Sequence, residues 1–404
     1  MNPLRRIAVD TIGRRSFLAG GLAIGLAACG GDDDPDPAVP VLEPTATLAP
    51  IPTQEPISSP VAGYGDPARW AGRTLQVASW GGNIETAQKT AFFDPFSAST
   101  GADLQVNTAD LERLREQIES ESVAWDVLTL PAEDALFFAR EGLLEPIDFN
   151  VVDRTQIIPE VVQQHGDGAA FFSTVIVYPA SRATPPASWA DFWTFPARES
   201  EDEPIAPEDL RALRRSPIGT LEFALLADGV AIDKIYPIDL ERAFASLDRI
   251  RDHVISWYED GKQPVELIMA EQIGMASAWN VRAWQLGVTT EIGTQWNGGM
   301  LSADIWVVPR GAPNADIAMD FINFCTRPIP SANFARLVPF GPVNIEAAAL
   351  LDPARLEEMP TAPENFDSQF IQNWVWWADN GEAITERFED WLLTEEPASP
   401  EAES

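Results

Sequence analysis

An alternation of strand-like and helix-like segments constrains the fold of this chain more than any other feature. Apolar or β-branched runs alternate three times with stretches that have helical character. The predicted strands are 74–79, 104–108 and 125–130, and the predicted helices are 84–96, 111–122 and 135–141. Strands that alternate with helices at this spacing are typical of parallel βαβ units. We therefore expect an α/β fold.

Aromatic and acidic residues stand where several of these strands end. Trp80 follows the first strand, Glu133 and Asp134 follow the third, and Trp279 ends a later apolar strand at 274–280. In open α/β sheets, ligands gather where strands end and loops begin, so the two tryptophans are candidate contacts. Acidic residues also favour the first turn of a helix, so Glu133 and Asp134 are either helix-capping residues or ligand contacts.

Asp304 precedes a short β-branched and aromatic run, 305–308 (IWVV), which is bounded by Asn297-Gly298-Gly299 before and Pro309 after. We expect that run to be a strand and a helix to begin at Asn314. A carboxylate beside an apolar run must be solvated, hydrogen-bonded or paired with a cation, because a dry unpaired charge is costly. Asp304 is therefore either a turn residue or a ligand contact.

The composition excludes some classes of function. The 404 residues carry a formal net charge of −35, which makes nucleic acid an improbable partner. The two histidines, His165 and His253, have no metal-ligand spacing, and we expect no metal and no cofactor. The two cysteines, Cys29 and Cys325, lie in regions too different to predict a disulfide. No nucleophile or phosphate-binding motif is present, although a pair of carboxylates could in principle serve a glycosidase.

The amino terminus has the order of an export signal: a basic start, a short apolar run and a small-residue end. Arg14-Arg15 followed by Phe17-Leu18 resembles the twin-arginine signal. Residues 26–29 (LAAC) resemble the lipobox of bacterial lipoproteins, in which the cysteine is acylated. We therefore predict a signal peptide at 1–28 and a lipid anchor on Cys29 that holds the protein to the outer face of the cell membrane.

The rest of the chain is long enough for two domains. A proline-, threonine- and aspartate-rich stretch after Cys29 predicts a disordered tether, and a small-residue stretch at 180–188 predicts a crossover. The predicted parts are a tether at 29–68, a first lobe at 69–180, a second lobe at 181–297, a return to the first lobe with C-terminal helices at 298–394, and a disordered tail at 395–404.

Residues from about 75 to 391 resemble the extracellular solute-binding proteins of ABC transporters, particularly the spermidine/putrescine-binding type. The segments that carry the resemblance are SWADFW at 188–193, LEFALLADGV at 221–230, YPIDLERAF at 236–244, ASAWNVRAW at 276–284, DIWVVPRGAPN at 304–314 and FGPVN at 340–344. The resemblance implies a two-lobe periplasmic-binding-protein-like fold (type II), in which lobes joined by crossover strands close over a ligand. It also implies a membrane permease as partner, a monomeric state and no catalysis.

The resemblance assigns roles by position. Trp80 matches the first-lobe aromatic of the polyamine binders, Trp279 the second-lobe aromatic, and Asp304 the acid that binds an amine. Glu133 and Asp134 fall at a first-lobe loop that contacts ligand, and Phe340 stands where an aromatic is expected. The implied ligand is a small, polyamine-like cation.

The chain departs from the polyamine binders at two places. Arg214-Arg215-Ser216-Pro217 stands where they have further acids, with Glu222 the nearest carboxylate, and residues 198–209 are an acidic insertion. A shorter diamine or a different cationic or polar metabolite therefore stays open as the ligand. Two hypotheses of a different kind also stay open: a carbohydrate-active enzyme that uses Glu133 or Asp134 with Asp304, and a surface scaffold with an inactive cleft.

Overall fold

The computed structural model of the protein describes residues 54–197, 200 and 204–394. In this part of the chain, nine strands form one sheet in the order β2-β1-β3-β8-β4-β7-β5-β6, with β9 beside β8. The strands are β1 (Thr74–Ser79), β2 (Asp103–Thr108), β3 (Val127–Pro131), β4 (Asp167–Pro179), β5 (Arg211–Arg214), β6 (Val254–Tyr258), β7 (Met275–Trp279), β8 (Ile292–Val307) and β9 (Phe370–Ile371).

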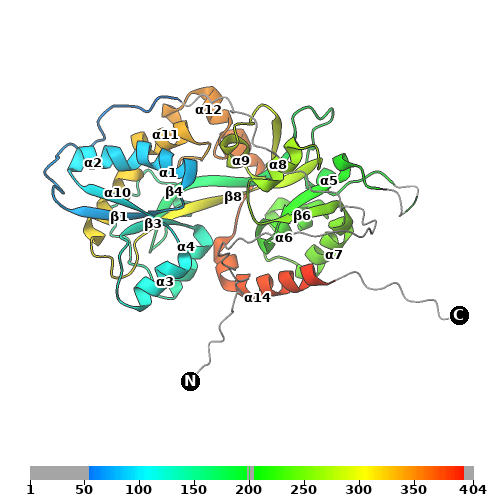
Figure 1. The fold of residues 1–404 in the computed structure, drawn as a ribbon, viewed down its shortest axis with the longest axis horizontal. Helices are drawn as coiled ribbons and strands as arrows, with labels where there is room; N and C mark the ends of the chain where they lie inside the picture. Colours follow the sequence, from blue (N-terminus) through cyan, green and yellow to red (C-terminus); the bar gives the residue numbers. More distant parts are fainter. Residues whose placement is uncertain (1–53, 198–199, 201–203, 395–404) are drawn as a thin grey trace, which may run out of the picture. The chain divides into compact units, whose positions relative to one another are not determined.

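Helices pack on both faces of this sheet (Figure 1). The α-helices are α1 (Gly82–Gln88), α2 (Asp94–Thr100), α3 (Leu111–Glu119), α4 (Ala132–Arg140), α5 (Trp189–Phe192), α6 (Pro217–Ala227), α7 (Leu240–Ile250), α8 (Gln263–Met269), α9 (Val281–Gln285), α10 (Ala315–Cys325), α11 (Pro328–Leu337), α12 (Pro353–Glu357), α13 (Pro363–Ser368) and α14 (Trp374–Leu393). A π-helical turn, η1 (Lys89–Phe93), joins α1 to α2.

Two groups of parallel strands are joined by a long antiparallel pair. β1 pairs in parallel with β2 and β3, and β5 pairs in parallel with β6 and β7. We call the part built on the first group the first lobe and the part built on the second group the second lobe. β4 and β8 run antiparallel to each other between the two lobes (Figure 1). The predicted α/β fold with crossover strands is confirmed.

β8 is longer than the sequence indicates. The Asn297-Gly298-Gly299 run does not bound the strand, because β8 continues through it, and the register with β4 breaks there instead. Gly298 has a φ of +74°, and a Cβ at this position would stand 2.9 Å from the ring of Trp189. The Trp189 indole donates a 2.8 Å hydrogen bond to the Gly298 carbonyl. The glycine therefore allows an irregularity within one strand.

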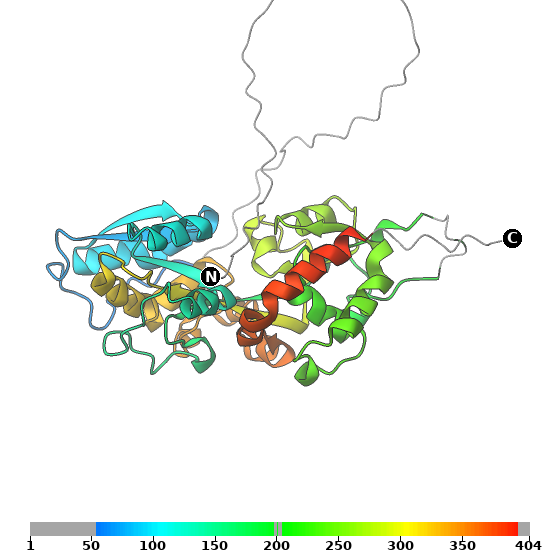
Figure 2. The same ribbon diagram turned by 90° about the horizontal axis from the view of Figure 1, so that it is seen from below.

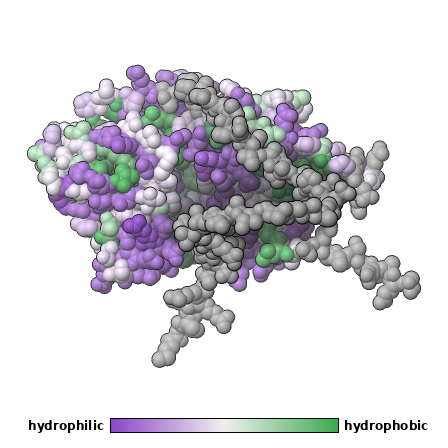
Figure 3. Space-filling view, viewed as in Figure 1, coloured by the Kyte–Doolittle hydropathy of each residue, from purple (hydrophilic) through white to green (hydrophobic). Residues whose placement is uncertain are grey.

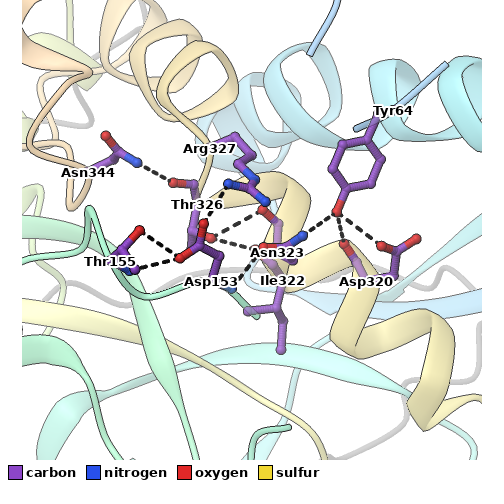
Figure 4. A network of polar contacts seen from close by, with 9 residues as sticks. All are labelled: Tyr64, Asp153, Thr155, Asp320, Ile322, Asn323, Thr326, Arg327 and Asn344. Atoms are coloured by element: carbon purple, nitrogen blue, oxygen red, sulfur yellow. Dashed lines mark hydrogen bonds and ion pairs between the residues drawn. The ribbon is translucent and has the colours of Figure 1, made fainter. Parts of the chain in front are cut away.

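The chain folds onto the first lobe earlier than the predicted end of the tether, residue 68. Tyr64 is buried, and its ring packs edge-on against Phe324 of α10 at 4.9 Å. Its hydroxyl donates to Asp320 and accepts from Asn323, and Asn323 in turn accepts from the backbone of Asp153 (Figure 4). An apolar ring with a satisfied hydroxyl stabilises this segment, so the prediction of disorder is wrong for the residues around Tyr64.

The C-terminal helix α14 packs against α4 of the first lobe and also against the second lobe. Trp377, Ile384 and Phe388 belong to the same core as residues of α6 and α7, and α14 lies along these elements in both ribbon views (Figures 1 and 2). The Trp377 indole donates to Glu222 of α6 at 2.7 Å. Trp374 instead joins the first-lobe core, so the start of α14 contacts both lobes. The predicted boundaries between the lobes otherwise stay a prediction.

Several predictions concern residues that the structure does not describe. Arg14, Arg15, Cys29 and the tail at 395–404 lie outside the described residues, as does part of the 198–209 insertion. In the described part, no helix has the length and apolar character needed to cross a membrane. The face seen in Figure 3 is largely hydrophilic with small hydrophobic patches, as the excess of acidic residues leads one to expect.

Candidate ligand-binding cleft

A cleft of about 750 Å³ lies where the two lobes meet. The ends of β1, β3, β5 and β7 reach it, together with the middle of β8 and the loop before Gly341. All six predicted site residues line it: Trp80, Glu133, Asp134, Trp279, Asp304 and Phe340. The structure therefore brings together residues that are up to 260 positions apart in the sequence. Their contact with a ligand stays a prediction.

Three carboxylates form the first-lobe wall of the cleft. Asp304 lies within β8, opposite Pro131 of β3 and Ala170 of β4, so it is a residue of a central strand and not of a turn. Glu133 and Asp134 occupy the first turn of α4, directly after β3. No side-chain hydrogen bond caps this helix, so the two acids are not capping residues, although they complement the helix dipole. Both acids line the cleft, and their contact with a ligand stays a prediction.

The environment of these acids disfavours their charged forms. Burial raises the pKa of Asp304 to about 7, and the Glu133 carboxylate adds to the rise. Burial and the neighbouring Asp134 raise the pKa of Glu133 to about 7. Burial also raises the pKa of Asp134, while Arg214 acts in the opposite direction. A cation that enters the cleft would favour ionisation of all three groups.

The second-lobe wall carries cations that the sequence analysis did not assign to the site. Arg214 ends β5, Arg282 lies in α9, and Lys262 precedes α8; all three line the cleft. Arg282 and Arg214 hold their guanidinium carbons 4.4 and 5.1 Å from the ring centre of Trp279. The resemblance implies that Trp279 is the second-lobe aromatic of a site for a cation, and here its ring already stacks with two cations of the protein. The signal in the sequence for these cations was Arg214-Arg215, which stands where the polyamine binders have acids.

The charges on the two walls do not neutralise one another directly. None of the ion pairs among the described residues includes an acid of the first wall or a cation of the second. Arg214 is nevertheless close enough to lower the pKa of both Glu133 and Asp134. Its sequence neighbour Arg215 points elsewhere and pairs with Glu389 at 2.5 Å. The cleft therefore presents unpaired charges of opposite sign across a gap.

Aromatic rings form an apolar surface between the charged walls. Phe172 of β4 lies 5.6 Å from Trp279 and 6.2 Å from Phe340, measured between ring centres. Asn280 fixes this arrangement, because its side chain accepts from the Ser173 backbone and donates to the Pro339 carbonyl. On the first lobe, Trp80 is 50% exposed and its indole donates to the Thr129 carbonyl at 3.0 Å. The rings can therefore cover the apolar part of a small ligand.

The described residues contain no group of three or more His, Cys, Asp or Glu side chains arranged to hold a metal ion. Glu133 and Asp304 do lie close enough for one carboxylate to raise the pKa of the other. Their proximity therefore leaves the hypothesis of a carboxylate-dependent enzyme open on geometric grounds.

The chain is similar to known solute-binding proteins over most of its length. The model of the bacterial extracellular solute-binding protein family matches residues 91–364. The γ-aminobutyric acid-binding protein of Pseudomonas aeruginosa is 33% identical over 334 residues, which cover 79% of this chain and 91% of that protein. The spermidine/putrescine-binding periplasmic protein of Salmonella typhimurium is 24% identical over 257 residues, 60% of this chain and 70% of that protein.

A solved structure shows the same similarity. The Atu4243–GABA receptor is 34% identical with a TM-score of 0.71, over 80% of this chain and 99% of that one. The family and these relatives are described as solute-binding proteins, a binding protein and a receptor, which argues against a carboxylate-dependent enzyme. The spermidine/putrescine type that the sequence suggests is matched only at lower identity.

Proposed function

This chain belongs to the bacterial extracellular solute-binding proteins, which act as ABC-transporter substrate-binding components, and on that premise we propose that it captures a small solute carrying both an amine and a carboxylate. An ω-amino acid such as γ-aminobutyrate is a simple member of this class. In the proposal, the amine lies against Glu133, Asp134 and Asp304, and the carboxylate lies against Arg214 and Arg282.

The observation that carries the proposal is the pair of oppositely charged, unpaired walls. A charge in a partly desolvated site is costly unless a partner meets it. The acids of α4 and β8 have no cationic partner among the described residues, and Arg214 has no anionic one. A ligand with an ammonium at one end and a carboxylate at the other supplies both partners.

The apolar surface of the cleft suits the short hydrocarbon chain of such a ligand. Phe172, Ile218 and Met300 line the same cleft as the acidic and basic side chains. Each methylene group of the ligand that packs on these side chains and is removed from water stabilises the complex by about 0.8 kcal/mol. The names of the relatives point the same way, because one is called a γ-aminobutyric acid-binding protein and another a GABA receptor.

A polyamine is the second candidate, and the three carboxylates of the first wall favour it. The weaker similarity to a spermidine/putrescine-binding protein supports it as well. A diamine that spans the cleft, however, would bring its far ammonium toward Arg214 and Arg282. Two like charges 4 to 8 Å apart repel by about 2 to 4 kcal/mol at an effective dielectric constant near 20. We therefore rank polyamines below amino acids as candidate ligands.

Isothermal titration calorimetry of the mature protein tests this order. The ligands are γ-aminobutyrate, δ-aminovalerate, putrescine and spermidine. We expect an amino acid to bind at least about 30-fold more tightly than either polyamine, the ratio that 2 kcal/mol of repulsion gives. Tighter binding of a polyamine would refute the assignment, and so would no heat from either amino acid.

Membership of this family places the protein outside the cytoplasm. We further propose that acylated Cys29 anchors it to the membrane, that it is monomeric and that it delivers its ligand to a membrane permease. Mass spectrometry of the protein from its native host tests the anchor: a mature chain that begins with acylated Cys29 supports it. Recovery of the chain with an unmodified Cys29 would contradict it.

A further inference from the structure

A second, much smaller cavity of about 30 Å³ lies against Asp304. It is on the face of the sheet that α1, η1 and α11 cover, and Gln88, Phe92 and Phe334 of these helices line it. Trp80 and Asp304 line both this cavity and the ligand cleft. The cavity is therefore a recess of the first-lobe wall.

The strand register explains why this recess forms where it does. Asp304 and Trp306 are two residues apart on β8 and so project from the same face of the sheet. Ala170 of β4 is the register partner of Asp304, and Thr129 of β3 is that of Trp306. Ala170 is a small residue among large aromatic ones, and it leaves space beside the carboxylate.

Two residues that line the recess carry polar groups without protein partners. Trp306 is 1% exposed, and among the described residues no acceptor meets its Nε1. A buried donor without an acceptor costs about 1 to 3 kcal/mol, so native proteins usually satisfy such a group with protein or water. No described residue donates a hydrogen bond to the side chain of Asp304, although Gln88 brings its amide to the same recess.

We propose that this recess binds ordered water, which accepts a hydrogen bond from Trp306 Nε1 and donates one to the Asp304 carboxylate. A site of this kind must be polar on at least two sides and must exceed about 10 to 15 Å³. The recess meets both conditions, and at about 30 Å³ it is too small for more than one or two water molecules.

In this proposal the water gives Asp304 a donor within the recess and leaves its other lone pairs for the ligand. This consequence depends on the proposed function, because it assigns the ligand amine to the cleft side of Asp304. A hydrogen bond to a carboxylate favours its ionised form. The water therefore prepares Asp304 to bind an ammonium group.

Crystal structures at a resolution that shows ordered water test the site. We expect a water peak within hydrogen-bond distance of Trp306 Nε1 and the Asp304 carboxylate, in ligand-free crystals and in crystals soaked with γ-aminobutyrate. The variant Ala170→Val fills the recess and should remove the peak. Ala318→Val is the control, because Ala318 is also buried in the same core but does not line the recess.

Calorimetry then measures the role of the water. Loss of one hydrogen bond to a charged group should weaken γ-aminobutyrate binding by about tenfold or more in Ala170→Val relative to Ala318→Val. Equal affinities of the two variants would overturn the role assigned to the water. The absence of a peak in both native crystals, or a ligand amine inside the recess, would overturn the site itself. The ligand-free crystal decides the site even if γ-aminobutyrate does not bind, an outcome that refutes only the proposed function.

Discussion

Replacement of Arg214 by glutamine should separate the two ends of the ligand. Arg214 ends β5, lines the cleft and forms no ion pair among the described residues, so its guanidinium is available to a ligand carboxylate. A hydrogen bond between charged groups contributes about 1.5 to 3 kcal/mol. Arg282 remains in the variant and keeps part of the attraction. We expect Arg214→Gln to weaken γ-aminobutyrate binding by about 30- to 150-fold, which corresponds to about 2 to 3 kcal/mol.

The same variant should leave binding of a simple amine nearly unchanged. Butylamine has the length of γ-aminobutyrate but no carboxylate, so the loss of Arg214 removes no contact. The guanidinium also lowers the pKa of Glu133 and Asp134. Titrations at about pH 8.5, above the pKa of about 7 to which burial raises Glu133, keep this second effect small.

Arg215→Gln is the matched control, because it makes the same substitution at the next residue. Arg215 lies outside the cleft and pairs with Glu389, and surface pairs of this kind contribute about 0 to 1 kcal/mol to stability. Its affinity for γ-aminobutyrate should stay within about twofold of the native protein, well inside 1 kcal/mol. The reasoning is refuted if Arg214→Gln binds γ-aminobutyrate as the control does, or if it loses butylamine affinity by the same factor.

Three further predictions follow from the buried carboxylates. Because the pKa values of Asp304 and Glu133 are raised to about 7, the affinity for γ-aminobutyrate should fall about tenfold for each required carboxylate between about pH 8 and pH 6. Calorimetry across this range measures the change, and a constant affinity would contradict the prediction. The raised pKa of Asp304 gives stability that is present below the unfolded pKa near 4 and is lost as pH rises through 7. The variant Asp304→Asn should therefore raise the unfolding temperature at about pH 8 but not at pH 4, and equal changes in unfolding temperature at the two pH values would contradict this. Glu222 is fully buried and accepts from Tyr236, Trp377 and the Gly219 backbone, so Glu222→Gln should cost about 1 to 3 kcal/mol in denaturant unfolding, and an unchanged midpoint would count against this role.

The sequence indicates the fold well because its signals are local. The alternation of strands and helices predicts the parallel pairs β1–β2 and β1–β3, and strand ends predict the positions of Trp80 and Trp279. The length of β8 was missed, because a glycine run normally ends a strand, whereas here Gly298 permits a break in register. The position of α14 could be predicted only in part, since an aromatic face shows that a helix is buried but not that it packs against both lobes.

The charge pattern of the cleft could be predicted only in part. Asp304 stands out locally, because a carboxylate beside an apolar strand needs a reason. Arg214 was visible as a departure from the polyamine binders, but its distance from the acids depends on how the two lobes meet. Arg282 carries no local signal of function, since an arginine in a short helix is ordinarily solvated. Opposition of charge across a cleft is a tertiary property.

A crystal structure with bound γ-aminobutyrate tests the central claim most directly. The account predicts that the carboxylate of the ligand lies on Arg214 and Arg282 of the second lobe, and that its ammonium lies among Glu133, Asp134 and Asp304 of the first. A ligand bound in the reverse orientation, or one whose carboxylate meets neither arginine, would contradict it.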